Sequence, residues 1–373
     1  MSAPLRVLIV RMGAMGDILH ALPAVASMRA GLGEDAVIHW LVEPQWIDLL
    51  AVNDAGGLDA VNSAPRGESK PLVDVIVPAD VKRWRKNLFS GETAREYLAL
   101  RRRLSANNYD AAVDFQGAIK SASMAWLSGA RFIVGPRTAR EALADIFYTV
   151  KPEVDSEHVV DQAFDVTEAA VMMFHDDEWQ TNEPFMPHPE YLPRDAAAEA
   201  WVDQQLTKLG ITKDKRFALL TPGAGWPAKQ WPAQKFGELA YTLVKEGMPC
   251  LINAAPVEAE LAEEVVIASQ DRARSVVCTL GQLIALTRRA SVFVGGDTGP
   301  MHLANLLGIP TVALFGPTRP WRNGPYYQPS ILLRSPQSEV NLSHSNQRDE
   351  GLESITVKEV MEAVKKVMSQ AKS

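Results

Sequence analysis

Short apolar runs alternate with segments of helical periodicity along the first half of the chain. A helix is expected from about residue 18, and the later connections are long enough for further helical crossovers. This alternation predicts a doubly wound α/β domain built on a parallel sheet. The strands are expected at residues 5–10, 37–42, 73–77, 111–115 and 131–134.

The same alternation resumes after a stretch rich in proline and acidic residues. Residues 176–194 lack periodicity, so we interpret them as part of a linker. The last segment, residues 356–370, repeats apolar residues at the spacing of one helical face and is expected to dock on a neighbouring element. The second set of strands is expected at residues 217–220, 249–253, 275–279, 291–294 and 311–315.

Length and composition agree with two soluble domains. A chain of 373 residues exceeds the usual size of a single hydrophobic core, and 47% hydrophobic with 22% charged residues is ordinary for a globular protein. We expect an N-terminal and a C-terminal Rossmann-like domain joined by a linker. The expected bounds are 1–175 for the first domain, 176–200 for the linker, 201–345 for the second domain and 346–373 for a C-terminal tail and helix.

Charge and cysteine content restrict the function further. The formal net charge of −7 argues against general nucleic-acid binding, which needs a dominant basic surface. No apolar run approaches the roughly 20 residues that span a bilayer. Cys250 and Cys278 have neither metal-ligand nor disulfide-framework spacing, which is typical of a reducing compartment. A cytoplasmic protein is therefore expected.

The first candidate motif, Arg-Met-Gly-Ala-Met-Gly-Asp at residues 11–17, lies where a strand passes into a helix. Open α/β sheets bind ligands at this edge. Its G-x-x-G spacing differs from the G-x-G-x-x-G of dinucleotide binders and disfavours a nicotinamide dehydrogenase. Asp17 is either a helix N-cap or a general base directed into a cleft.

Two further glycine-rich loops follow strands of the second half. In residues 292–302, backbone N–H groups at a helix start are suited to phosphate, with Thr298 and His302 as added donors; alternatively, Asp297 only caps a tight turn. In residues 221–232, small residues allow close approach of a ligand, and Lys229 supplies a point charge suited to a diphosphate. Such fixed donors can replace a metal. The sequence contains no Asp-x-Asp pair or His/Cys cluster, so no metal or other cofactor is expected.

Basic residues are concentrated in the first half of this acidic chain. Arg101–Arg103 lie on a predicted helix and are interpreted as a solvated face. The Lys-Arg-Trp-Arg-Lys cluster at residues 82–86, with Lys120, Arg137 and Arg140, instead indicates a substrate that bears carboxylates or phosphates, or an anionic membrane surface.

Taken together, these motifs resemble glycosyltransferase family 9, which contains the lipopolysaccharide heptosyltransferases. The resemblance extends over nearly the whole chain and implies the GT-B architecture, with two Rossmann-like domains facing across a cleft. The family-level motifs are MGDIL at 15–19, PGA at 222–224, KQWP at 229–232, GDTGPMH at 296–302 and FGPT at 315–318. The chain looks most like those members that add the first heptose to Kdo, in residues 82–86, 114–121, 138–141 and 147–148.

The resemblance implies that the N-terminal domain binds the acceptor and the C-terminal domain binds the ADP-sugar donor, and it assigns roles residue by residue. It implies an inverting transfer of heptose from ADP-heptose to a Kdo-bearing lipid A, with Asp17 as catalytic base and with peripheral contact to the cytoplasmic face of the anionic inner membrane near residues 82–86. Glu258 would bind the ribose hydroxyls, and Asp297 would position the heptose. The diphosphate would be held by Lys229, Thr298, Gly299 and His302. The acidic acceptor would be held by Arg83, Arg85, Lys86, Lys120 and Arg140.

Two other hypotheses remain open at this point. One is a family member that adds a later core heptose or uses a different nucleotide-activated sugar. The other is a catalytically idle protein that binds nucleotide sugars or serves as a scaffold, against which the presence of both Asp17 and Lys229 argues.

Overall fold

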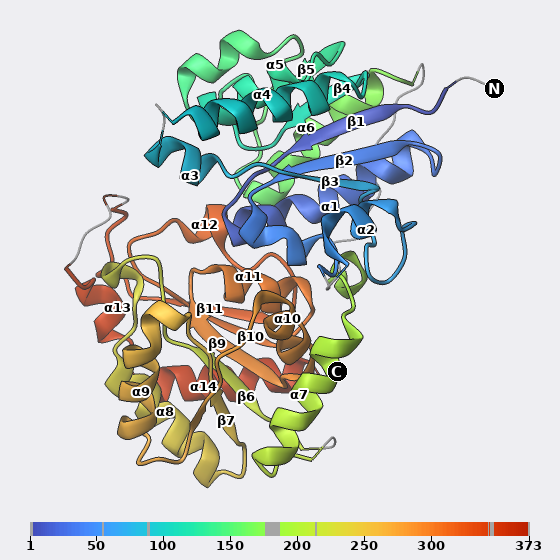
Figure 1. Ribbon diagram of the computed structural model, residues 1–373. Coiled ribbons are helices and arrows are strands. Elements are labelled where there is room, and N and C mark those ends of the chain that lie inside the picture. Colours follow the sequence, from blue (N-terminus) through green and yellow to red (C-terminus); the bar gives the residue numbers. More distant parts are fainter. Residues whose placement is uncertain are drawn as a thin grey trace. The chain divides into compact units, whose positions relative to one another are not determined.

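The chain forms two compact units in the computed structural model (Figure 1). The structure describes residues 3–53, 56–87, 90–175, 187–212, 215–341, 343 and 347–371. Of these, residues 3–175 and 190–194 belong to the first unit, and residues 187–189 and those from 195 onward belong to the second. The expected linker, 176–200, lies outside the described residues at 176–186, and its last five residues already begin a helix of the second unit.

The first unit contains a five-stranded parallel sheet in the order β3-β2-β1-β4-β5. All five predicted strands are present, and their apolar residues are buried because helices cover both faces. The strands are β1 (Arg6–Val10), β2 (Val37–Val42), β3 (Val75–Pro78), β4 (Ala111–Asp114) and β5 (Phe132–Val134). The helices are α1 (Met15–Leu32), η1 (Pro44–Leu49), α2 (Gly57–Ser63), α3 (Val81–Lys86), α4 (Gly91–Ser105), α5 (Ile119–Leu127), η2 (Ala142–Phe147) and α6 (Val159–Met172), where η denotes a 3-10 helix.

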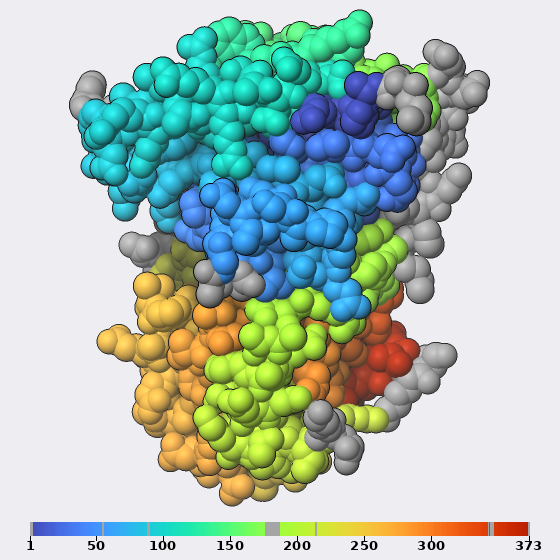
Figure 2. All heavy atoms as spheres, turned by 45° about the vertical axis from the view of Figure 1, so that its right-hand side comes forward, coloured from blue at the N-terminus to red at the C-terminus, as the bar shows by residue number. Residues whose placement is uncertain are grey.

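One face of this sheet is covered by α3, α4, α5 and η2, which we call the α3–η2 layer. Trp84 of α3, Leu104 of α4, Ala125 of α5 and Ala144 of η2 belong to a single buried core together with Leu8 of β1. Helices α1 and α6 are not part of this layer and pack against each other. The α3–η2 layer therefore presents its outer side to solvent as one surface, part of which is the cyan to green area of Figure 2.

The second unit contains a six-stranded parallel sheet in the order β11-β10-β9-β6-β7-β8. The five predicted strands are present, although β8 is shorter than expected, and β11 was not predicted. The strands are β6 (Ala218–Thr221), β7 (Cys250–Ile252), β8 (Arg274–Ser275), β9 (Val292–Gly296), β10 (Thr311–Phe315) and β11 (Ser330–Arg334). The helices are η3 (Pro189–Tyr191), α7 (Ala196–Lys208), η4 (Pro227–Lys229), α8 (Ala233–Lys245), η5 (Pro256–Glu258), α9 (Ala259–Ala268), α10 (Leu280–Arg289), α11 (Gly299–Leu306), α12 (Pro320–Asn323), α13 (Glu350–Ser354) and α14 (Val357–Gln370).

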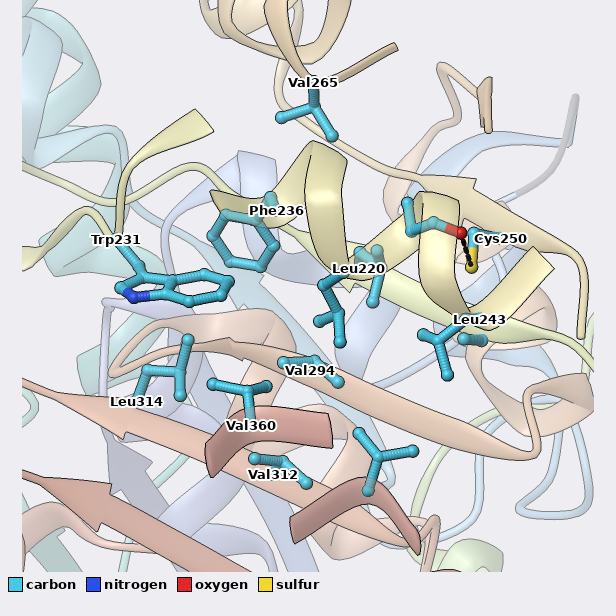
Figure 3. Packing of buried hydrophobic residues seen from close by; sticks show 14 of the residues in the cluster. Leu220, Trp231, Phe236, Leu243, Cys250, Val265, Val294, Val312, Leu314 and Val360 are labelled. Atoms are coloured by element: carbon cyan, nitrogen blue, oxygen red, sulfur yellow. Dashed lines mark hydrogen bonds between the residues drawn. The ribbon is translucent and has the colours of Figure 1, made fainter. Parts of the chain in front are cut away.

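The predicted C-terminal helix is α14, and it packs on the second unit. A reciprocal capping box starts the helix: the Glu359 amide donates to Thr356 Oγ1 at 3.2 Å, and the Thr356 amide donates to Glu359 Oε2 at 2.7 Å. Val360 enters the core around Trp231, as Figure 3 shows. Trp231 Nε1 also donates to the carbonyl of Ile355, just before the helix, at 3.1 Å. The segment expected to form a separate tail and helix thus contributes to the core of the second unit.

Within the described ranges, no helix combines the length and apolar character needed to cross a bilayer.

The buried His39 makes the stability of the first unit sensitive to acid. Its Nδ1 lies 2.7 Å from the hydroxyl of Tyr109, and burial, aided by the charges of Arg6 and Arg103, lowers the pKa of His39 to about 4. The unfolded chain then binds more protons than the folded one between about pH 6.5 and 4, so stability decreases as the pH falls through this window. We expect a loss of about 2–3 kcal/mol by pH 4.5 and a flatter profile in His39→Gln. Urea unfolding at pH 7 and pH 4.5 measures this; equal losses in both proteins would contradict it.

Candidate active site

The first glycine-rich loop leads directly into α1, which begins at Met15 rather than near residue 18. Ala14 is the N-cap residue, so Asp17 is not the cap but the third residue of the helix. One oxygen of Asp17, Oδ2, accepts the Ala14 amide at 3.2 Å. The other oxygen, Oδ1, lies 2.8 Å from Nη2 of Arg11, and the side chain of Asp17 is 36% exposed. The carboxylate is therefore fixed in position while remaining accessible.

Arg11 connects this carboxylate to the neighbouring strand. Its side chain is buried, its Nε donates to the carbonyl of Asp17 at 3.2 Å, and its Nη1 donates to the carbonyl of Phe115 at 2.6 Å. The guanidinium thus holds both the backbone and the side chain of Asp17 against the end of β4. Arg11 was not predicted as a site residue, although a charged residue directly after a buried strand is a signal for this edge of the sheet.

Replacing the guanidinium of Arg11 by the single amine of lysine should lower the rate of turnover more than the affinity for the donor. Arg11→Lys keeps the charge but cannot reach Asp17 and Phe115 together, so we expect kcat to fall about 10- to 100-fold with little change in the KM for the donor. Steady-state kinetics measure this, with Arg101→Lys on the exposed face of α4 as control. An unchanged kcat would show that Asp17 does not need this contact.

Three charged or titratable side chains meet at one edge of the second sheet: Asp297 from the loop after β9, Lys229 from the end of η4 and His302 from α11. Asp297 is 6% exposed, and its Oδ2 lies 2.9 Å from Nζ of Lys229 while its Oδ1 lies 3.4 Å from Nε2 of His302. Burial alone would raise the pKa of Asp297, but the hydrogen bond from His302 and the charge of Lys229 hold it below its ordinary value. Lys229 Nζ also lies 4.7 Å from the centroid of the Trp226 ring. The structure therefore brings Lys229, Asp297 and His302 together.

Thr298 and Gly299 occupy the start of α11. Thr298 is the N-cap residue and Gly299 is the first residue of the helix. Because Asp297 contacts Lys229 and His302, its carboxylate has a role beyond capping its own turn. Pro300 has no N–H, and the amide of Met301 donates to the carbonyl of Thr298 at 3.1 Å. The amide of Gly299 is therefore the donor of this first turn that is suited to an anion.

Glu258 lies at the same edge of the second sheet, after β7. Its Oε2 accepts the amide of Ala255 at 3.2 Å. A Cβ atom added to Gly223 would lie only 2.2 Å from this oxygen, so glycine is needed there for the carboxylate to pack on the backbone. On the other side of the loop, a Cβ atom on Gly296 would lie 3.0 Å from the carbonyl of Lys229. The segment from Gly223 to Lys229 thus packs against Glu258 on one side and against the end of β9 on the other.

The predicted acceptor residues lie on the α3–η2 layer and at the edge of the first sheet. Arg83 forms ion pairs with Asp80 at 3.2 Å and with Glu92 at 3.4 Å, and a closer one with Glu96. The hydrogen bond to Glu96 raises the pKa of Arg83. The other predicted residues are Arg85 and Lys86 at the exposed end of α3, Lys120 in the first turn of α5 and Arg140 in the exposed loop after β5.

Glu43 and Trp46 lie at this edge of the first sheet and were not predicted as site residues. Burial raises the pKa of Glu43, opposed by the charges of Lys120 and Lys82. Glu43 follows β2 directly, and nearby Trp46 packs over the first loop so closely that a Cβ atom on Gly13 would lie 2.9 Å from its Nε1. Both follow a predicted strand, which is the signal that could have identified them.

Among the described residues, no group of three or more His, Cys, Asp and Glu side chains is arranged to hold a metal ion.

The chain is similar to known glycosyltransferases over nearly its whole length. Residues 97–351 match the family described as glycosyltransferase family 9 (heptosyltransferase). Lipopolysaccharide heptosyltransferase 1 of Escherichia coli (strain K12) is 27% identical over 91% of this chain and 97% of that protein. Two solved structures, E. coli heptosyltransferase WaaC with ADP and with ADP-2-deoxy-2-fluoro heptose, have TM-scores of 0.73 and 0.71 at 26% identity, each covering 97% of this chain and 99% of the other. These matches confirm the expected fold of two Rossmann-like domains.

Proposed function

Because the chain belongs to glycosyltransferase family 9, the heptosyltransferase family, and has the GT-B fold, we propose that it transfers L-glycero-D-manno-heptose from ADP-heptose to Kdo of the lipopolysaccharide inner core. The proposed acceptor is Kdo-bearing lipid A. The observation that carries this proposal is the cluster of Lys229 with the buried Asp297 and His302 at the start of α11. Such a cluster is suited to a leaving group that carries two phosphates.

The donor side of the reaction is assigned to the second unit. Lys229, Thr298, Gly299 and His302 would hold the diphosphate, because a lysine and the N-terminal end of α11 concentrate positive potential there. Asp297 fixes Lys229 through its 2.9 Å ion pair and would position the heptose. Glu258 would accept hydrogen bonds from the ribose hydroxyls.

The acceptor side is assigned to the first unit. Asp17 would take the proton of the acceptor hydroxyl as that oxygen forms a bond to the anomeric carbon. The bond from the anomeric carbon to the phosphate oxygen breaks on the opposite face, and ADP leaves with the electron pair, so the anomeric configuration inverts. The Kdo carboxylate and nearby phosphates would be bound by Arg83, Arg85, Lys86, Lys120 and Arg140.

A lipid-linked acceptor requires the enzyme to work at a membrane surface. We therefore assign the protein to the cytoplasm and to peripheral contact with the inner membrane. The basic residues 82–86 on α3 support electrostatic attraction to anionic lipids. Membrane flotation that is unchanged when these charges are reversed would contradict this contact.

Mass spectrometry of Kdo-bearing lipid A after incubation with ADP-heptose and the enzyme tests the proposal. A mass gain of one heptose is expected. No gain, with transfer from another nucleotide sugar or to an acceptor that already carries heptose, would identify a different family activity. No transfer from any donor would instead favour an idle binding protein.

A further inference from the structure

Large apolar side chains are exposed together on the α3–η2 layer. Trp126 of α5 is 58% exposed, and Leu143 and Ile146 of η2 are 64% and 71% exposed. Because residues three apart in a 3-10 helix lie on the same side, Leu143 and Ile146 point in one direction. Helices α5 and η2 pack on each other, with the rings of Trp126 and Phe147 6.2 Å apart. We call Trp126, Leu143 and Ile146 the apolar patch.

The acidic groups next to the apolar patch already have partners. Glu141 accepts the amide of Ile119, the first residue of α5, at 2.9 Å. Asp145 forms a 2.9 Å ion pair with Lys151. Helix α5 itself contains no acidic residue and includes Lys120. The acids of η2 therefore oppose an anionic surface only weakly.

The layer around the patch is basic, although the chain as a whole is acidic. Residues 80–153, from the cap of α3 to just after η2, contain 13 Lys and Arg against 8 Asp and Glu, whereas the full chain has 38 against 45. One of those eight acids, Asp114, is completely buried. An exposed apolar patch within a basic surface matches a bilayer, which offers anionic headgroups above an apolar interior.

From this arrangement we infer that the apolar patch inserts into an anionic lipid surface, where Trp126, Leu143 and Ile146 enter the boundary between headgroups and acyl chains. Tryptophan is suited to this boundary because its ring is largely apolar and its N–H stays hydrated. This insertion differs from the electrostatic contact at residues 82–86, because burial of apolar side chains persists when salt screens charges. It rests on the proposed function only in that Lys120 and Arg140, beside the patch, are assigned to a lipid-linked acceptor.

Vesicle flotation without substrate tests the insertion directly. The wild-type protein should bind vesicles of phosphatidylethanolamine and phosphatidylglycerol, bind phosphatidylcholine vesicles less, and keep part of its binding at about 0.5 M NaCl, where charges are screened within about 4 Å. Leu143→Glu with Ile146→Glu should lower the partition coefficient about tenfold or more and abolish the salt-resistant part. The matched control is Ile267→Glu with Val277→Glu, since these side chains of the second unit are 63% and 58% exposed.

A second readout separates lipid binding from damage to the enzyme. The double variant at Leu143 and Ile146 should transfer heptose normally to a deacylated, water-soluble Kdo acceptor and more slowly to the same acceptor embedded in vesicles. Unchanged vesicle binding in this variant, equal losses in the control variant, or no binding by the wild-type protein would each overturn the inference. If the wild-type protein binds vesicles through the patch but transfers no heptose, the proposed function fails and the insertion stands.

Discussion

Asp17→Asn should slow heptose transfer by about 10³-fold, because general-base assistance contributes about 10² to 10⁴ and an amide cannot accept the proton of the attacking hydroxyl. The substitution keeps the size of the side chain and leaves its carbonyl oxygen near Arg11. The groups assigned to the donor lie in the second unit, so the KM for ADP-heptose should change little. Initial rates at saturating donor, followed by mass spectrometry of the acceptor, measure this effect.

A matched control distinguishes a base from a residue that only stabilises the helix. Asp161 has the same position in α6 that Asp17 has in α1, the third residue after the N-cap. If Asp17 acted only through the N-terminal end of its helix, Asp17→Asn and Asp161→Asn would have similar effects, each about 0.3–1 kcal/mol of stability. We expect this modest loss in both variants but the loss of kcat in Asp17→Asn alone. More than a tenth of wild-type activity in Asp17→Asn would show that another group takes the proton.

The sequence predicted the strands of both sheets well because parallel strands are buried on both faces. Their apolar runs are nearly continuous, so β2 and β10 have the predicted bounds. Strand β11 was not predicted because it lies at the edge of its sheet, where its residues are only half-buried. Edge strands lack the continuous apolar signal of central ones.

Local rules also placed the start of α1 too late. Ala14 has no side chain that can cap a helix, and the capping contact comes from Asp17 inside the first turn. Pro23 lies inside this helix, although proline is usually tolerated only in the first turn of a helix or at a kink. Packing of α1 against α6 buries most of its surface, and tertiary contacts of this kind outweigh the cost of a proline.

The candidate site was predicted residue by residue, but its contacts were not. Lys229 and Asp297 are far apart in the sequence and meet because β6 and β9 are neighbours in the sheet. Periodicity indicates that a strand exists without specifying which strand lies beside it. The same limit explains Arg11, whose partner Phe115 follows β4, the neighbour of β1.

Removing the buried carboxylate of Asp297 should cause a large loss of stability in the second unit. Asp297→Ala leaves Lys229 and His302 close together without the anion between them, and breaking a buried ion pair on one side costs about 3–5 kcal/mol. Because the pKa of Asp297 is held below its ordinary value of 3.8, its contribution is present above about pH 4 and is lost as the pH falls further. Urea unfolding at pH 7 therefore measures the intact cluster.

A double-mutant cycle with Lys229 separates stability from catalysis. Lys229→Met should also destabilise the protein, because the buried carboxylate of Asp297 then loses the closer of its two partners in the cluster. Combining Lys229→Met with Asp297→Asn removes both charges, so the double variant should be more stable than the sum of the single losses predicts, by about 1–3 kcal/mol. The measurement is the free energy of unfolding of the wild type, of the single variants Lys229→Met and Asp297→Asn, and of the double variant.

Transfer activity should not recover with stability. Lys229 is assigned to the departing diphosphate, and loss of one such electrostatic donor costs about 10² to 10³ in kcat. The double variant should therefore fold better than either single loss implies and still transfer heptose at least about 100-fold more slowly than wild type. If activity returned together with stability, the cluster would be a structural ion pair and the diphosphate would bind elsewhere. Additive stability losses would instead mean that Lys229 and Asp297 do not depend on each other, contrary to their 2.9 Å contact.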